Sequence, residues 1–161
     1  MRAGRAGLLT PFRSRGFALL WTGMTVSLPG DGVLLVALAW QVYELSNAPT
    51  ALSIVGVAWT LPLVLFVLLG GVVSDRVDRR KVMIAADLIR FGGIAALGAL
   101  SVAGALELWH VIALVAVYGA GEAFFGPAFG AIVPDIVPRD QLVQANSLNQ
   151  LMRPLAHRLV G

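Results

Sequence analysis

The feature that most constrains this chain is a set of long apolar stretches separated by short polar ones. A helix that crosses the hydrocarbon core of a bilayer needs about 20 consecutive, mostly apolar residues. Four stretches meet this length, and a fifth begins at residue 145 and continues to residue 161. The four complete stretches are residues 17–43, 51–73, 82–106 and 109–133. The sequence therefore predicts an all-α membrane protein with four transmembrane helices and the start of a fifth.

Composition supports this class and excludes others. Of the 161 residues, 58% are apolar and 13% are charged, whereas soluble domains carry about 45–50% and about 25%. The absence of cysteine excludes disulfides and thiol catalysis, and His110 and His157 are too far apart in sequence to suggest a metal site. The sequence contains no phosphate-binding loop, zinc-protease motif or nucleophile elbow. We therefore expect no enzyme activity, no cofactor and no metal.

The polar connections alternate in charge, and this alternation predicts the orientation. Basic residues occur in the N-terminal tail (residues 1–16) and in the loops at 74–81 and 134–144, but not in the connections at 44–49 and 107–110. Because cytoplasmic loops of membrane proteins are enriched in Lys and Arg, we expect a multi-pass protein of the inner (plasma) membrane with a cytoplasmic N-terminus. The high isoelectric point, about 10.2, then reflects topology, so we expect a lipid bilayer as partner and no nucleic acid.

Four charged residues fall inside the predicted spans. Charge at mid-membrane costs about 2.5–3.5 kcal/mol on insertion scales and commonly marks function. Asp31 follows Pro29 and Gly30 near the middle of the first span, where proline and glycine would loosen or interrupt a helix. Asp31 is a candidate ligand for substrate or a coupling proton, and a capping or packing role at a kink is the alternative.

The other three residues lie in the third and fourth spans. Glu122 is a second candidate for proton or substrate binding, unless it only hydrogen-bonds a neighbouring helix. Asp87 and Arg90 are three residues apart and share a helix face, which favours a structural ion pair over a part in gating. Small residues at Gly70–Gly71 and in the Gly126-x-x-x-Gly130 spacing predict close helix packing.

The loop between the second and third spans carries a recognisable motif. Residues 71–81 read Gly-Val-Val-Ser-Asp-Arg-Val-Asp-Arg-Arg-Lys, which closely resembles the signature loop of the major facilitator superfamily. The matching positions are Gly71, Asp75, Arg76, Arg79 and Arg80, and Asp78 replaces the second glycine of the family pattern. In that family the loop acts as a conformational latch, and the resemblance implies the same role for Asp75 and the matching arginines.

Further segments are similar to the enterobactin exporter and macrolide efflux branch of that superfamily: residues 47–49, 86–90, 125–128 and 134–146. The resemblance implies a proton-coupled antiporter that exports a small molecule, drug or siderophore-like. The arginine motif of the fourth span in many proton-driven exporters is absent, and Glu122 lies in that region instead. The antiporter motif of the fifth span would follow residue 161.

The superfamily builds a transporter from two six-helix bundles with the substrate between them. The chain then corresponds to part of the N-terminal bundle, and we expect it to need the missing C-terminal helices and to be inactive alone. The alternative is a four-span interaction or regulatory protein without transport activity, which the short length favours and the signature loop disfavours.

Overall fold

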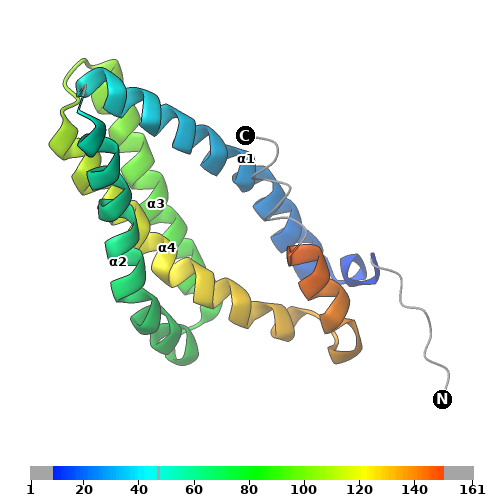
Figure 1. Ribbon diagram of the computed structural model, residues 1–161. Helices are drawn as coiled ribbons and strands as arrows, with labels where there is room; N and C mark the ends of the chain where they lie inside the picture. Colours follow the sequence, from blue (N-terminus) through cyan, green and yellow to red (C-terminus); the bar gives the residue numbers. More distant parts are fainter. Residues whose placement is uncertain (1–8, 47, 151–161) are drawn as a thin grey trace. The chain divides into compact units, whose positions relative to one another are not determined.

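The computed structural model describes residues 9–46 and 48–150. Every regular element within these two ranges is helical. The order is a 3₁₀ turn η1 (Thr10–Arg13), α1 (Arg15–Leu45), α2 (Pro49–Arg76), α3 (Arg79–Val102), α4 (Leu108–Ile136) and a second 3₁₀ turn η2 (Arg139–Gln141) (Figure 1). The chain is helical again over 142–150. The rest of the fifth predicted span, residues 151–161, and the first half of the N-terminal tail lie outside the described residues.

All four long helices have the length and apolarity needed to cross a membrane. They contain 31, 28, 24 and 29 residues, against the roughly 20 that a bilayer requires. The most apolar part of α2 is only 6% buried within the protein, so most of its leucines and valines are exposed, with Val55 a buried exception. The predicted all-α membrane class, with four spanning helices, is confirmed.

Most helix ends extend further into the polar connections than the apolar stretches do, but α3 ends at Val102, before the predicted end at residue 106. Ser74, Asp75 and Arg76 close α2, and α3 begins at Arg79, so only Val77 and Asp78 join the two helices. The Asp78 side chain caps α3 by accepting a hydrogen bond from the backbone N–H of Arg80 at 2.9 Å. An aspartate at this position satisfies one of the first free N–H groups of a helix, which accounts for Asp78 where the family pattern has glycine.

The helix α1 runs without interruption through Pro29. The helix break suggested by Pro29 and Gly30 is therefore not observed. Proline removes one backbone donor, but a single lost hydrogen bond leaves the remaining ladder on either side intact. Asp31 consequently projects from a regular helix rather than from an unwound segment.

The chain divides into two compact units. The first unit combines Met1–Ala37 with Ile132–Gly161. Its core consists of Phe17, Val133, Val137, Ala145 and Leu148. The hydroxyl of Ser14, just before α1, donates to the backbone carbonyl of Ile136 at 2.6 Å, so the start of α1 is fixed to the end of α4.

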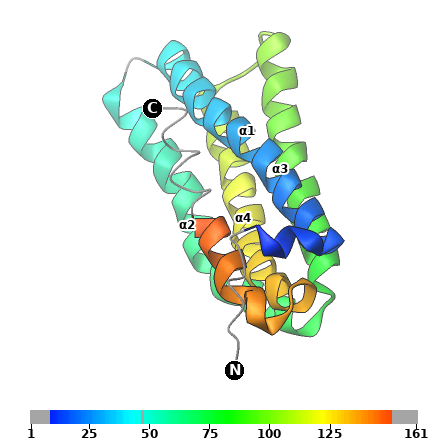
Figure 2. The same cartoon turned by 90° about the vertical axis from the view of Figure 1, so that its right-hand side faces the viewer.

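The second unit, Leu38–Ala131, is built around α4. The helix α4 lies beside α2 and α3 (Figure 2), and glycines mark the close approaches. A Cβ at Gly119 would overlap the backbone of Trp59 on α2, a Cβ at Gly70 would overlap the carbonyl of Ala123 on α4, and a Cβ at Gly93 would touch the carbonyl of Leu114. Small residues therefore let the backbones of α2 and α3 approach α4 closely.

Three of the four predicted packing glycines make no close approach within the described residues. Nothing lies within 4 Å of a Cβ built at Gly126 or Gly130, so the GxxxG spacing is not a packing site within the described residues. At the end of α2, Gly70 makes the close approach, whereas Gly71 faces open space. Gly70 and Gly71 differ because neighbouring residues in a helix point in different directions.

Candidate functional site

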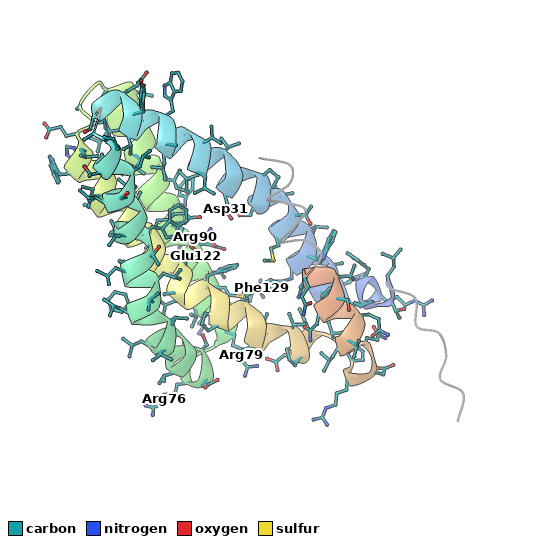
Figure 3. The ribbon with its side chains drawn as sticks, viewed as in Figure 1. Asp31, Arg76, Arg79, Arg90, Glu122 and Phe129 are labelled. Atoms are coloured by element: carbon teal, nitrogen blue, oxygen red, sulfur yellow. The ribbon has the colours of Figure 1, made fainter. Side chains whose placement is uncertain are left out.

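Three helices of the second unit bring together a group of polar and aromatic side chains, which we call the three-helix polar cluster. Figure 3 shows Arg90 of α3 and Glu122 of α4 at the same level of these helices. The cluster consists of Trp59 on α2, Asp87 and Arg90 on α3, and Tyr118, Glu122 and Phe125 on α4.

Arg90 is a largely enclosed charge of the cluster. Its side chain is 11% exposed. The guanidinium carbon lies 4.7 Å from the centroid of the Tyr118 ring and 5.5 Å from that of Phe125, within the range of cation–π attraction. Arg90 also donates a hydrogen bond to the Tyr118 hydroxyl. Two aromatic faces and a hydroxyl thus surround a guanidinium that would otherwise be costly to place in an apolar helix bundle.

Asp87 accompanies Arg90 as the sequence spacing suggests. One guanidinium nitrogen of Arg90 lies 3.3 Å from Oδ1 of Asp87, one turn earlier on α3. The Asp87 side chain is 58% exposed, so the carboxylate lies at the surface of this unit while its partner is enclosed. The two members of the ion pair thus differ in burial. The enclosed guanidinium of Arg90 is therefore stabilised by its aromatic neighbours as well as by the exposed carboxylate.

Gly121 makes room for the arginine. A Cβ at Gly121 would lie 2.9 Å from Cγ of Arg90 and 3.2 Å from the carbonyl oxygen of Ala86, closer than ordinary van der Waals contact. The aliphatic stem of Arg90 therefore rests directly on the backbone of α4.

Glu122 has a different environment. Its carboxylate accepts a hydrogen bond from the indole N–H of Trp59 at 3.0 Å, across 63 residues of sequence. The Trp59 ring meets the Tyr118 ring edge-on, with centroids 4.9 Å apart and an interplanar angle of 69°. Contacts therefore run from Glu122 through Trp59 and Tyr118 to Arg90, linking all three helices.

Asp31 belongs to the other compact unit. Its side chain is half-buried within α1. The two predicted proton or substrate residues, Asp31 and Glu122, therefore lie in different units.

The signature loop lies at the end of α2 and the start of α3. Asp75, Arg76 and Arg80 are exposed. Arg79 is half-buried, and its guanidinium donates to the backbone carbonyl of Ala131 on α4 at 3.0 Å. Arg76 and Arg79 are labelled in Figure 3. Arg79 thus connects the signature loop to α4 through a hydrogen bond.

Sequence reasoning missed the aromatic members of the cluster. Tyr118, Glu122 and Phe125 are spaced i, i+4 and i+7, which places them on one face of α4 and could have indicated that they belong together. Trp59 carries no such signal, because its contact with Glu122 depends on how α2 packs against α4.

Four long apolar helices in the described part of the chain define a multi-pass membrane protein. Comparison with known proteins agrees. Residues 6–161 match the family model described as transmembrane secretion effector. The chain belongs to this family of the major facilitator superfamily.

Curated relatives carry related descriptions. The chain is 30% identical over 141 residues to macrolide efflux protein A of Streptococcus pyogenes, covering 88% of this chain and 35% of that protein. It is 33% identical over 110 residues to the multidrug efflux pump Tap of Mycolicibacterium fortuitum, covering 68% of this chain and 26% of that protein. No solved structure matches. The chain thus spans about a third of the length of these relatives, and the expected similarity to macrolide efflux proteins is confirmed.

Proposed function

We propose that the protein to which this chain belongs exports a small molecule across the plasma membrane. The family and the efflux proteins among the relatives support transport in this direction. The observation that carries the proposal is the three-helix polar cluster. An arginine and a glutamate inside apolar helices cost free energy on membrane insertion, and such residues commonly mark a substrate or ion pathway.

Coupling to protons is the second part of the proposal. Glu122 and Asp31 are carboxylates within long apolar helices, where a proton can be taken up and released during a transport cycle. The hydrogen bond from Trp59 to Glu122 comes from a neutral donor, so the carboxylate is not committed to a strong ion pair. A carboxylate held in this way can exchange its proton without first breaking a salt bridge.

The signature loop is proposed to act as a conformational latch. Arg79 holds the carbonyl of Ala131, while Asp75 and Arg76 are exposed at the same end of α2. Charged side chains that remain exposed next to such an anchor are available to pair with another part of a full transporter in one conformation and to separate in the other.

Efflux can be tested in cells that express the full-length protein and are loaded with radiolabelled erythromycin, a macrolide. Expression is expected to lower the accumulated label, and dissipation of the proton gradient is expected to restore it. Glu122→Gln and Asp31→Asn are each expected to abolish the gradient-dependent part. Asp140→Asn, at an exposed carboxylate in η2, is the matched control and is expected to retain efflux.

The outcome also separates the proposal from the four-span interaction or regulatory protein. If Glu122→Gln and Asp31→Asn both export label as well as the unsubstituted protein does, proton coupling through these residues is wrong. If the unsubstituted protein leaves the accumulation of macrolides and of cationic dyes unchanged while present in the membrane, the efflux proposal itself fails.

A further inference from the structure

Trp59 is held against α4 by three separate contacts. Its ring packs edge-on against Tyr118 at 4.9 Å, its backbone fills the space that a Cβ at Gly119 would need, and its indole N–H donates to Glu122 at 3.0 Å. Tyr118, Gly119 and Glu122 lie on two adjacent turns, so Trp59 of α2 packs against a continuous patch of α4.

The other tryptophan–carboxylate hydrogen bonds of the described residues differ in kind. Trp40 donates to Glu44 at 3.0 Å within α1, and Trp109 donates to Glu107 at 2.7 Å over two residues. Trp40 and Trp109 are 66% and 60% exposed. Both bonds are local and exposed, whereas the bond from Trp59 connects two helices at a half-buried position.

The geometry makes the bond to Glu122 sensitive to the position of α2. Because the backbones already touch at Gly119 and at Gly70, α2 cannot move closer to α4 and can only slide or separate. Hydrogen bonds from N–H groups weaken rapidly beyond about 3.2 Å, so a displacement of about 1 Å would remove the donor from the carboxylate. Within the described part of the chain, Glu122 has no ion pair that would replace it.

We propose that Trp59 is a positioning residue for Glu122: its indole N–H fixes the carboxylate and makes its environment depend on the packing of α2 against α4. The proposal rests on the proposed function insofar as Glu122 acts in transport, but the hydrogen bond can be tested without transport. Any change in the packing of α2 against α4 would then change how the charge of Glu122 is stabilised.

The first experiment uses fluorescence and needs no substrate. In the full-length protein, tryptophans other than Trp59 are replaced by phenylalanine, and the emission of Trp59 is recorded in lipid nanodiscs across a pH titration. A pH-dependent change in emission is expected, with loss of that change in Glu122→Gln. A pH response that is the same with and without Glu122→Gln would overturn the proposal.

The second experiment measures transport. Trp59→Phe keeps an aromatic ring but removes the N–H, and it is expected to shift the pH profile of erythromycin efflux, while Trp59→His, which restores an N–H donor, recovers part of the original profile. Trp40→Phe and Trp109→Phe remove the exposed bonds and are the matched controls, with unchanged profiles expected. An unaltered profile in Trp59→Phe would overturn the positioning role.

The two experiments fail independently. If the unsubstituted protein exports nothing, the proposed function fails, yet the fluorescence titration still decides whether Trp59 responds to Glu122. The amount of each variant in the membrane is measured by immunoblotting. If Trp59→Phe and Trp59→His both fail to accumulate, the fluorescence titration, in which Trp59 is intact, decides whether the positioning role stands.

Discussion

The close approach of α2 to α4 makes a quantitative prediction about two glycines of the same helix. Gly119→Ala adds a methyl group where the backbone of Trp59 already lies, with its carbonyl carbon 3.0 Å and its Cα 3.3 Å from the new atom. Gly126→Ala adds the same methyl group seven residues later, where nothing lies within 4 Å.

The expected difference in stability between the two variants can be estimated because the effect of the alanine on the helix backbone is the same in both. Replacing glycine by alanine in a helix interior is favourable by about 0.8–1.0 kcal/mol, and this gain applies to both positions of α4. Overpacking a well-filled contact costs about 1–3 kcal/mol, and it applies only to Gly119, because the obstacle is a helix backbone rather than a flexible side chain. We therefore expect Gly119→Ala to be less stable than Gly126→Ala by about 1–3 kcal/mol.

The assay is reversible unfolding of the purified protein in detergent micelles with increasing sodium dodecyl sulfate, followed by tryptophan fluorescence. Gly126→Ala is expected to unfold at the same or a slightly higher detergent fraction than the unsubstituted protein, and Gly119→Ala at a lower one. Equal unfolding midpoints for the two variants would refute the packing of α2 on α4 at Trp59.

Three other outcomes are expected. Asp78→Ala removes the cap of α3 and should destabilise the protein by about 0.5–2 kcal/mol, whereas Asp78→Gly should destabilise it less because glycine is a tolerated cap. Thermal unfolding of the two variants measures the difference, and an equal loss of stability in both would argue against capping. Since the chain contains no cysteine, single cysteines introduced at Ala48 and Asp140 can be labelled with a membrane-impermeant maleimide. Ala48→Cys should react in intact cells and Asp140→Cys only after lysis. The reverse pattern would contradict a cytoplasmic N-terminus. The 161-residue chain expressed alone should insert into the membrane without lowering erythromycin accumulation, and efflux by it would contradict the need for further helices.

The four long helices could be predicted because the length of an apolar run in the sequence is also what allows a helix to span a membrane. The positions of the helix ends were harder to predict. Ser74 and Arg76 are polar yet helical, because the backbone hydrogen bonds of α2 continue as far as its C-cap Val77, whose N–H donates to the carbonyl of Val73. Hydropathy marks where lipid contact stops, and capping marks where the helix stops.

The candidate site shows the same division between local and long-range information. The proximity of Asp87 and Arg90 follows from a spacing of three residues on one helix. The pairing of Trp59 with Glu122 crosses 63 residues and depends on which glycine of α4 admits the backbone of α2. Glycine spacing alone pointed to Gly126 and Gly130, because a sequence pattern does not say which face of a helix meets a neighbour.

The bond between Ser14 and the carbonyl of Ile136 joins residues 122 positions apart, and this separation sets an order of assembly. A ribosome that adds about 5–20 residues per second needs about 6–24 s to travel from one to the other. The first helix enters the membrane well before its N-terminal anchor exists. The hydroxyl of Ser14 therefore acquires its native partner, and the ring of Phe17 its contact with Val133, only when the end of α4 has been synthesised. Docking of the N-terminal turn against α4 thus follows the synthesis of all four long helices.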